Sequence, residues 1–563
     1  MKEKGVGNMH QLIEKWKAAQ LPSYLTEELT QYNESQLEDC FYQALTFGTG
    51  GMRGELGVGI NRMNIYTIRK AAYGLAKHVT LSGEKAKAQG VVIAYDTRHF
   101  SKEFAIETAR VLGAQGVKAY VFSKERPTPE LSFAVRYLHA YAGVVITASH
   151  NPKQYNGFKV YGSDGAQMVP KDVQVIIDEM SAVNDLFSIE VADFDVHSQW
   201  ILEEIDQAYL EHLRKLKLRE INNEMKLVYT PLHGAGLEPI TQGLKEIGFT
   251  NIHIVDEQAK PDGDFSTVPY PNPEDSAAFE MAIALGKEVG ADILLATDPD
   301  ADRLGVAVRQ DNDYVLLTGN QLGALVLEYL LSTKKALGTL ASNGVVLKTI
   351  VTAELGTIIA RQYGIEVVNV LTGFKYIAEK IAEYEFTREK EFIFGYEESY
   401  GYLVQPFVRD KDAVQLALVT AEMATYYAQQ GKTLLDALES LFQQYGYYKE
   451  KLVSKEFPGK SGQEKMQQLL DAYRNNPLTE IAGVEVKCIE DYLTSTATFS
   501  DGTTAVLDLP KENVLKYILQ DNSWIAIRPS GTEPKCKFYI GTTAHDETLA
   551  NNKLMAINSS IMI

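Results

Sequence analysis

The sequence contains little cysteine, and its cysteines are not arranged for crosslinking. Only 3 occur among 563 residues, Cys40, Cys488 and Cys536, and none belongs to a CxxC pair. A disulfide framework and a zinc knuckle both need closely spaced cysteines, so neither is expected. This cysteine usage is typical of a reducing compartment, and we expect a cytoplasmic location.

Long apolar runs and a surplus of positive charge are also missing. No stretch of 18 apolar residues occurs, and the first residues, MKEKGVGNMHQLIEKWKAA, lack the apolar core of a signal peptide. Lys and Arg number 55 against 74 Asp and Glu, a formal net charge of −19. A surface of this sign repels nucleic acid and anionic membranes, so we expect a soluble protein that binds neither. No feature indicates an obligate protein partner, and an anionic substrate would need a local basic cluster.

Several common catalytic motifs are absent as well. The sequence contains no GxSxG, no HExxH and no GxGxxG. These absences argue against an α/β-hydrolase, a zinc metalloprotease of that type and a dinucleotide-binding fold.

Apolar strand-like segments alternate with helical segments over most of the chain. Strands are expected at 91–97, 117–122, 142–147, 252–256, 291–297, 344–350, 367–371 and 391–396. This order predicts three consecutive similar α/β domains with mixed, mostly parallel sheets. After about residue 450, short strand candidates such as SWIAIRP and KFYIG indicate a smaller C-terminal α+β domain. We place the domains at 1–215, 216–335, 336–450 and 451–563, around a central cleft.

Three aspartates follow one apolar strand at alternate positions. Asp298, Asp300 and Asp302 form the motif DPDADR directly after ADILLAT. In an extended loop alternate side chains point the same way, so three carboxylates would converge and repel each other unless a cation neutralises them. Hard oxygen ligands favour Mg²⁺ or Mn²⁺. The motif therefore predicts a metal site, although a solvated acidic loop would have the same composition.

Three other segments carry polar groups suited to ligand binding. TASHNP (147–152) places Ser149 beside His150 just past a strand, which is also typical of an ordinary turn. GYEESYGY (395–402) offers paired carboxylates among aromatics, which suits a carbohydrate or a tyrosine-rich core turn. RPSGTEPK (528–535) offers donors for a phosphate dianion, or forms a simple β-turn.

The four segments occur together, in order, at domain-scale spacing. In this combination the chain resembles the α-D-phosphohexomutase superfamily, in particular the phosphoglucomutase branch of bacteria and animals that also contains phosphopentomutases. The resemblance extends from FGTGGMRG (47–54) to KFYIG (537–541). It implies an intramolecular phosphotransferase that interconverts α-D-glucose 1-phosphate and glucose 6-phosphate through a phosphoserine. Phosphopentomutase, phosphomannomutase and a sugar-phosphate-binding regulator without turnover remain alternatives.

The resemblance also implies roles for individual residues. Ser149 is similar to the phosphoryl-carrying serine, with His150, Lys159 and Lys411 as further catalytic residues. Asp298, Asp300 and Asp302 with a Ser149 oxygen would hold one Mg²⁺ per chain, and glucose 1,6-bisphosphate would serve as activator and intermediate. The implied substrate-binding residues are Arg53, Arg303, Thr372, Gly373, Lys375, Glu397, Ser399, Arg528, Ser530, Gly531, Thr532 and Lys537. Lys537 stands where many members have Arg, and Ala413 where many have Gly.

Overall fold

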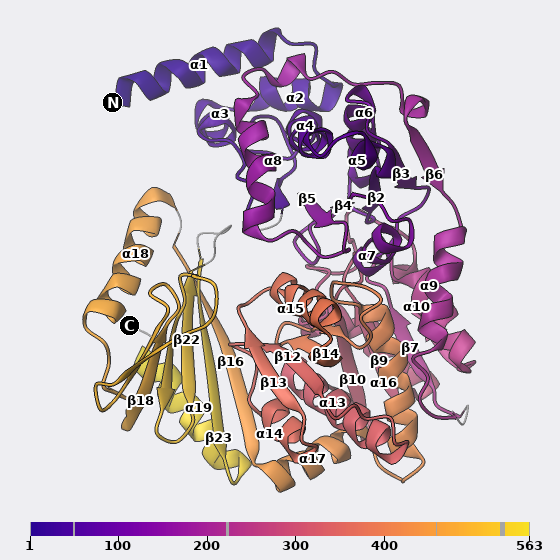
Figure 1. The fold of residues 1–563 in the computed structure, drawn as a ribbon, viewed down its shortest axis with the longest axis vertical. Helices are drawn as coiled ribbons and strands as arrows, with labels where there is room; N and C mark the ends of the chain where they lie inside the picture. The colour runs from indigo at the N-terminus through magenta and orange to yellow at the C-terminus, as the bar shows by residue number, and fades with distance from the viewer. Residues whose placement is uncertain (1, 49–50, 221–223, 458, 530–534, 562–563) are drawn as a thin grey trace. The chain divides into compact units, whose positions relative to one another are not determined.

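The chain forms two compact units, which are described separately. The computed structural model describes residues 2–48, 51–220, 224–457, 459–529 and 535–561 (Figure 1). The first unit comprises Met1–Thr318, Ala378–Thr387 and Ser399–Tyr426, and the second comprises Gly319–Ile377, Arg388–Glu398 and Tyr427–Ile563. Among the described residues no helix has both the length and the hydropathy that a membrane span requires.

The first unit begins with a six-stranded sheet in the order β1-β5-β4-β2-β3-β6. The strands are β1 (Gly51–Glu55), β2 (Val91–Tyr95), β3 (Ala119–Phe122), β4 (Ala142–Ile146), β5 (Tyr155–Gly162) and β6 (Ser198–Ile201). Strands β4, β2, β3 and β6 run parallel, whereas β5 pairs antiparallel with β4, and β1 pairs antiparallel with β5 at the edge of the sheet. The strands predicted at 91–97, 117–122 and 142–147 are confirmed, with ends that differ by at most two residues.

Helices cover both faces of this sheet (Figure 1). One face carries α4 (Ile65–Leu81), α6 (Ser101–Ala114) and α8 (Pro170–Ala182), and the other carries α7 (Thr128–Tyr137). Leu75 and Phe104 of the first layer are fully buried against Ile93 and Val144 of the sheet. The buried apolar face of each helix explains why these segments read as amphipathic in the sequence.

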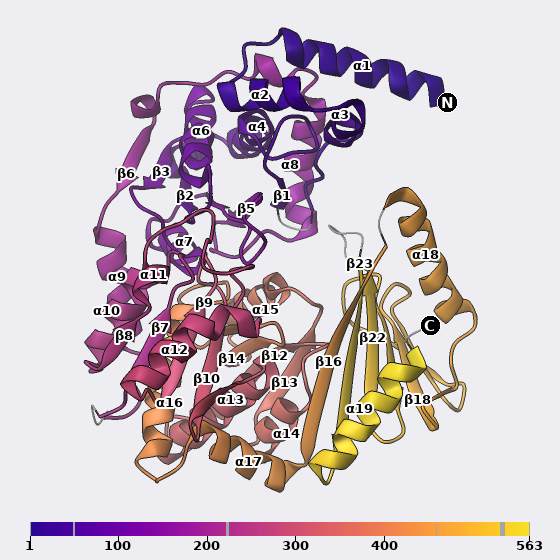
Figure 2. The same cartoon turned by 180° about the vertical axis from the view of Figure 1, so that it is seen from behind.

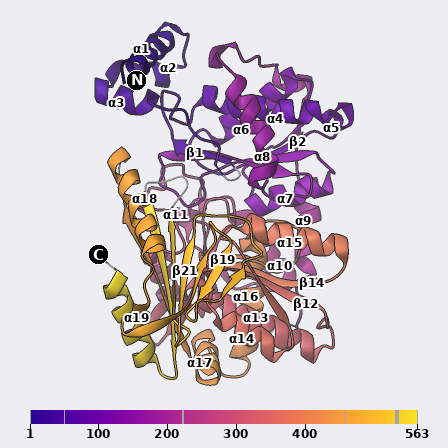
Figure 3. The same cartoon turned by 60° about the vertical axis from the view of Figure 1, so that its left-hand side comes forward.

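Three helices precede the first sheet and were not predicted from the sequence. Helices α1 (Lys2–Ala18), α2 (Ser23–Gln31) and α3 (Glu34–Phe41) lie together at one end of this unit (Figure 3). Trp16 is fully buried between them and makes edge-on contacts with Phe41 and Tyr66, at centroid distances of 5.5 and 5.3 Å. Edge-to-face pairs of this kind stabilise an aromatic core.

The second sheet of the first unit has five strands in the order β11-β10-β9-β7-β8. They are β7 (Leu227–Thr230), β8 (Ile252–Ile254), β9 (Ile293–Thr297), β10 (Leu304–Gln310) and β11 (Asp313–Leu316). The core β7-β8-β9 pairs are parallel, with α10 (Leu237–Ile247) and α12 (Glu280–Val289) as connections, and α9 (Glu204–Arg214) precedes the sheet. Strand β9 ends directly before DPDADR, and β10 returns antiparallel to it.

The second unit contains a parallel sheet and a larger antiparallel sheet. Strands β12 (Gly344–Thr349), β13 (Glu366–Val370) and β14 (Glu391–Glu397) pair in the order β13-β12-β14. Helices α13 (Gly319–Ala336), α14 (Leu355–Gln362) and α17 (Leu434–Tyr445) accompany them. Of the remaining elements of this region, β15 (Gly401–Leu403) and most of α16 (Ala413–Ala428) belong to the first unit.

The C-terminal sheet is antiparallel and has the order β16-β23-β22-β21-β18-β19-β20, with β17 paired to β18. Its strands are β16 (Tyr447–Glu456), β17 (Glu480–Ile481), β18 (Val484–Asp491), β19 (Thr496–Phe499), β20 (Thr504–Val506), β21 (Leu515–Leu519), β22 (Trp524–Pro529) and β23 (Lys535–Ala544). Helix α19 (Glu547–Ile561) lies along β16 and β23, as Figure 2 shows, and α18 (Gly459–Asn475) follows β16. The predicted fold class, three α/β domains followed by a smaller α+β domain, is confirmed.

Gly157 occupies the most crowded backbone position beside the serine loop. It lies on β5 between β4 and β1, and its carbonyl accepts a hydrogen bond from the Thr147 amide at 3.2 Å. A Cβ at this position would lie 2.5 Å from the Thr147 oxygen and 3.0 Å from the Met52 oxygen. Only glycine lets these strands approach so closely.

Gly157→Ala should therefore destabilise the first unit. Forcing a methyl group into a packed site costs about 1–3 kcal/mol, which should lower the melting temperature by several degrees in calorimetry. Gly113→Ala is the matched control, because a Cβ there would meet its neighbours at 3.6 Å within α6 and should be neutral or stabilising. Equal melting temperatures for the two variants would contradict the crowding argument.

Candidate active site

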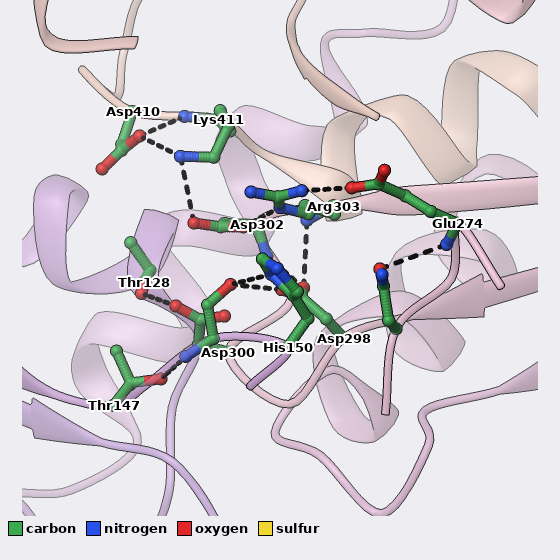
Figure 4. A network of polar contacts seen from close by, with 12 residues as sticks. Thr128, Thr147, His150, Glu274, Asp298, Asp300, Asp302, Arg303, Asp410 and Lys411 are labelled. Carbon is green, nitrogen blue, oxygen red and sulfur yellow. Dashed lines mark hydrogen bonds and ion pairs between the residues drawn. The ribbon is translucent and has the colours of Figure 1, made fainter. Parts of the chain in front are cut away.

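Ser149 lies in a short loop after β4, held in an unusual backbone conformation. Its φ is +53°, in the left-handed region that residues other than glycine rarely adopt. The Ser149 amide donates to Thr147 Oγ1 at 2.8 Å, and its Oγ donates to Asp298 Oδ2 at 2.7 Å. His150 Nδ1 lies 3.3 Å from the same Oγ (Figure 4). The loop thus aims one buried hydroxyl at the aspartate cluster.

Arg98 holds this loop in place. Its guanidinium is buried, lies 3.3 Å from Asp96 Oδ2 and donates to four loop carbonyls, those of Ser149, Asn151, Pro152 and Tyr155. Sequence reasoning missed this residue, although YDTR follows a strand on the same sheet as TASHNP. A rigid, five-donor side chain suits this task better than lysine would. The left-handed conformation of Ser149 is therefore maintained by contacts outside the loop itself.

The three aspartates of DPDADR converge in a tight turn. Asp298, Asp300 and Asp302 are 0–1% exposed, and each can offer an oxygen within 4.8 Å of the others. We expected an extended loop, but the Ala301 amide bonds the Asp298 carbonyl at 2.9 Å and Ala301 has a φ of +46°. The carboxylates therefore converge because the chain turns back on itself, not because alternate residues of a strand share a face.

In two of the carboxylates one oxygen is held by the protein while the other has no hydrogen-bond partner. Asp300 Oδ2 accepts from Thr128 Oγ1 at 2.8 Å, and Asp302 Oδ2 lies 3.1 Å from Lys411 Nζ (Figure 4). Asp300 Oδ2 also accepts from Lys159 Nζ at 3.0 Å. Oδ1 of Asp300 and Oδ1 of Asp302 are buried and accept no hydrogen bond from the described residues. Buried carboxylate oxygens are costly when unsatisfied, and a divalent cation is the group that would satisfy both. The residues present therefore fit a metal ion.

Asp298 completes the set in a different way. Its Oδ1 accepts from the backbone amides of Asp302 and Arg303, both at 3.1 Å, while Oδ2 faces the Ser149 hydroxyl. The Asp298 carboxylate therefore stabilises the turn with one oxygen and faces Ser149 with the other. These contacts place the serine oxygen and three carboxylates around one point.

The pKa directions of the three carboxylates reflect their burial and their mutual repulsion. Burial raises the pKa of Asp298 well above its ordinary value, and the charges of Asp300 and Asp302 raise it further. Burial also raises the pKa of Asp302. Burial opposes the charge of Asp300 too, but Lys159 and Thr128 outweigh it and hold that pKa below its ordinary value. Without a cation the cluster is an electrostatic cost to the fold.

Two lysines face this cluster from different parts of the first unit. Lys159 lies on β5, and although burial disfavours its charge, Asp300 and Asp302 raise its pKa above the ordinary value. Lys411 is fixed by Asp410, whose Oδ1 accepts from the Lys411 amide and ammonium at 2.8 and 3.1 Å. The other oxygen of Asp410 accepts from the Tyr161 hydroxyl at 2.7 Å. The ammonium groups of both lysines can therefore neutralise negative charge on an anion that binds at Ser149.

Two arginines predicted to bind substrate also lie near these loops. Arg53 on β1 donates to Asn151 Oδ1 at 2.8 Å and so contacts the serine loop. Arg303 pairs with Glu274, and its Nε lies 3.8 Å from Asp302 Oδ1 (Figure 4). Both arginines therefore contact residues of the cluster or its loop.

A glycine-containing loop after β7 packs against the aspartate turn. The Ala235 amide in PLHGAG (231–236) donates to the Pro299 carbonyl at 2.8 Å. A Cβ at Gly234 would lie 2.5 Å from Pro299 Cα, so only glycine permits this approach. The motifs singled out in the sequence do not include this segment. The loop therefore helps to position the turn that carries the three aspartates.

The predicted sugar-binding residues, apart from Ser399, lie in the second unit. Glu397 Oε1 accepts from the Gly373 amide at 2.9 Å, so the β14 end and the loop after β13 are joined. Gly373 has a φ of +114°. Thr372 Oγ1 is buried and bonds no described residue, and Lys375 Nζ lies 5.1 Å from the Tyr376 ring centroid. Ser399 falls in the first unit, in the turn that follows Glu398.

The predicted phosphate clamp is described only in part. Arg528 at the end of β22 pairs with Glu512, with Nε 3.1 Å from Oε1, and lies opposite Lys537 of β23. Ser530, Gly531 and Thr532 lie outside the described residues. Of the predicted set, the structure brings together Ser149, His150, the three aspartates and the two lysines within the first unit.

Comparisons with known proteins agree along the whole chain. Four profiles described as phosphoglucomutase/phosphomannomutase match in order: alpha/beta/alpha domain I at 44–186, domain II at 207–311, domain III at 318–445 and the C-terminal domain at 470–557. A curated phosphoglucomutase of Staphylococcus aureus is 40% identical over 521 residues, which cover 92% of this chain and 93% of the relative.

Solved structures show the same fold at lower identity. A phosphoglucomutase/phosphomannomutase family protein of Burkholderia thailandensis has a TM-score of 0.66 at 19% identity, covering 92% of this chain and 96% of its own. Parafusin, a phosphoglucomutase of Paramecium in an open form, has a TM-score of 0.66 at 17% identity, covering 92% and 95%.

Asp298→Asn should stabilise the metal-free protein. Because the folded-state pKa of Asp298 lies above the unfolded value, the metal-free wild type loses stability as pH rises through that interval, whereas Asn has no proton to lose. In EDTA the variant should melt higher at pH 8, by roughly 2–4 °C per kcal/mol relieved, and the difference should shrink toward acid pH.

The same melting experiment tests the cation. Mg²⁺ or Mn²⁺ should raise the melting temperature of the wild type and raise that of Asp298→Asn much less. Asp313→Asn, an exposed position on β11, is the control and should respond like the wild type. An identical metal response in wild type and Asp298→Asn would remove Asp298 from the ligand set.

Proposed function

Because the chain belongs to the phosphoglucomutase/phosphomannomutase family, we propose that it interconverts α-D-glucose 1-phosphate and glucose 6-phosphate. It is a phosphotransferase enzyme of the isomerase class, and its curated relatives at 40% identity are phosphoglucomutases. The observation that carries the proposal is the Ser149 hydroxyl, bonded to Asp298 at 2.7 Å inside a cluster of three buried carboxylates and two lysines. A family member with this serine in this setting has the parts that phosphoryl transfer requires.

The proposed cycle uses Ser149 as a phosphoryl carrier. The phosphoserine gives its phosphoryl group to a free hydroxyl of the sugar phosphate, and the serine oxygen leaves as the acceptor oxygen bonds phosphorus. The product of this step is glucose 1,6-bisphosphate. The bisphosphate turns and returns its other phosphate to Ser149, which yields the isomeric monophosphate and restores the phosphoserine.

The basic residues have separate parts in this proposal. Lys159 is kept charged by Asp300 and Asp302, so it neutralises negative charge on the transferring oxygens and does not act as a base. We assign proton transfer to Lys411, positioned by Asp410: its ammonium gives a proton to the departing serine oxygen, and the resulting amine takes the proton of the accepting sugar hydroxyl, so that Lys411 is charged again after the step. Contact with the serine oxygen is assigned to His150. A single Mg²⁺ held by the three aspartates and a Ser149 oxygen would supply further positive charge at the phosphoryl group.

The remaining predicted residues bind the sugar and its phosphate in this proposal. Glu397, with Thr372, Gly373 and Ser399, would bind sugar hydroxyls, and Lys375 would contact the substrate. Arg528 and Lys537, with Ser530, Gly531 and Thr532, would hold the phosphate that is not reacting, and Arg53 and Arg303 would assist at the serine loop. No nucleic acid, membrane or obligate protein partner is part of the proposal.

We also propose a cytoplasmic location for this enzyme. All three cysteines, Cys40, Cys488 and Cys536, are free and buried, which supports a reducing compartment.

The function is tested by a coupled assay with Mg²⁺ and a trace of glucose 1,6-bisphosphate. We expect turnover of both glucose phosphates, and intact-mass measurement should show a population heavier by one phosphate. A higher kcat/KM for ribose 1-phosphate or mannose 1-phosphate would replace the proposed substrate by a pentose or mannose phosphate. Sugar-phosphate binding with no turnover of any of them would indicate a regulator.

Ser149→Ala should abolish both turnover and the phosphorylated population, because it removes the hydroxyl that is proposed to carry the phosphoryl group. Ser523→Ala is the matched control, since Ser523 is also buried but lies in the turn between β21 and β22 of the C-terminal domain. If Ser149→Ala retained the phosphate, the carrier would be a different residue.

Arg528→Ala should act mainly through KM. A clamp on the non-reacting phosphate binds the ground state and the transition state equally well. A charge-assisted hydrogen bond is worth roughly 1.5–3 kcal/mol, so its loss should weaken substrate binding by about one to two decades. Steady-state kinetics should show this rise beside a smaller change in kcat. Arg474→Ala removes another ion-paired arginine of the same domain and should leave KM unchanged. An unchanged KM in Arg528→Ala would falsify the clamp assignment.

A further inference from the structure

Thr128 contacts the aspartate cluster without belonging to any of the motifs singled out in the sequence. It is the first residue of α7 and is fully buried. Its Oγ1 donates to Asp300 Oδ2 at 2.8 Å, and its backbone amide donates to the Asp300 carbonyl at 2.9 Å (Figure 4). One residue therefore binds both the main chain and the side chain of a predicted metal ligand.

The hydroxyl decides which oxygen of Asp300 is free to bind a cation. Thr128 and Lys159 together occupy Oδ2, while Oδ1 is buried and bonds no described residue. A carboxylate held by one donor can turn about its terminal torsion, whereas one held by two donors at a single oxygen cannot turn without breaking a bond. We propose that Thr128 is a positioning residue that fixes Asp300 with Oδ1 toward the metal. This inference rests on the metal site of the proposed function.

Thr128 is itself anchored by the segment before it. The neighbouring Arg126 amide donates to the Tyr95 carbonyl at 3.0 Å. The Arg126 guanidinium lies 2.6 Å from Asp206 Oδ2 on α9 and 3.1 Å from Glu238 Oε2 on α10. These ion pairs join the first α/β sheet to the helices of the second. Thr128 is thus held rigidly against the sheet that carries the aspartate turn.

The hydroxyl has no role in starting its own helix. The N-cap of α7 is Pro127, and no side chain caps this helix. A threonine at a helix start usually bonds a nearby backbone amide, but here Oγ1 is directed to a residue 172 positions away. The side chain therefore serves Asp300 rather than α7.

Thr128→Val tests the inference, because valine keeps the shape and removes only the hydroxyl. We expect Mn²⁺ to bind the full-length, EDTA-treated variant about tenfold more weakly, measured by electron paramagnetic resonance titration. Thr128→Ser, which restores the donor, should bind Mn²⁺ like the wild type. In the activity assay, Thr128→Val should raise the Mg²⁺ concentration needed for half-maximal rate. The factor of this increase should be larger than the factor by which the rate falls at saturating Mg²⁺.

Thr108→Val is the matched control. Thr108 is equally buried in α6, and its hydroxyl donates to the Phe104 carbonyl at 2.7 Å, far in sequence from the aspartate turn. It should lower stability slightly and leave Mn²⁺ affinity unchanged. If Thr128→Val does not fold, Thr128→Ala takes its place with the same expectation.

The possible results separate this inference from the proposed function. Wild-type affinity in both Thr128→Val and Thr128→Ser would overturn the positioning role and leave the proposed metal site standing. Equal losses of Mn²⁺ affinity in Thr128→Ser and Thr128→Val would mean that the methyl group of Thr128 matters and not its hydroxyl. This result would also overturn the positioning role. A wild type that binds no Mn²⁺ would remove the metal site itself, and the role of Thr128 with it.

Discussion

The first unit depends on keeping three carboxylates together in a buried turn. Asp298, Asp300 and Asp302 can each offer an oxygen within 4.8 Å of the others, and all three side chains are buried. Buried like charges persist only where fixed donors and cations compensate them. The compensating groups come from three positions distant in the sequence, Thr128, Lys159 and Lys411, and from the amides of the turn itself. Much of the unit's polar architecture can be understood as the support of this one turn.

The same arrangement explains why catalytic and structural tasks overlap. Lys159 and Lys411 stabilise the carboxylates in the resting protein, and the same charges suit a phosphoryl group at Ser149. Arg98 belongs to the scaffold, since its two Nη groups donate to loop carbonyls and its Nε faces Asp96. A site assembled in this way needs little rearrangement when an anion arrives, because its dipoles and charges are already oriented.

Local patterns in the sequence predicted the strands and the loops that follow them. Apolar runs such as 91–97 and 291–297 end at polar segments, and this was enough to locate Ser149 and the aspartates. The supporting contacts could not be predicted because they join residues far apart in the chain. Arg98 reaches carbonyls 51 to 57 positions away, Thr128 bonds Asp300 across 172, and Tyr161 bonds Asp410 across 249. The turn at Ala301 was missed for a different reason, since its left-handed conformation is not favoured by alanine and is imposed by the surrounding bonds.

The pairing of Arg528 with Glu512 has a consequence for how a phosphate is received. The guanidinium is already ordered by a carboxylate whose second oxygen is buried and bonds no described residue. A free arginine side chain loses up to about 2 kcal/mol of rotamer entropy when it is immobilised. Here that loss occurs once, as the chain folds, and is not repeated at each encounter with a ligand. In the proposed clamp the guanidinium would therefore act as a preorganised receptor, with its donors in place before a dianion binds.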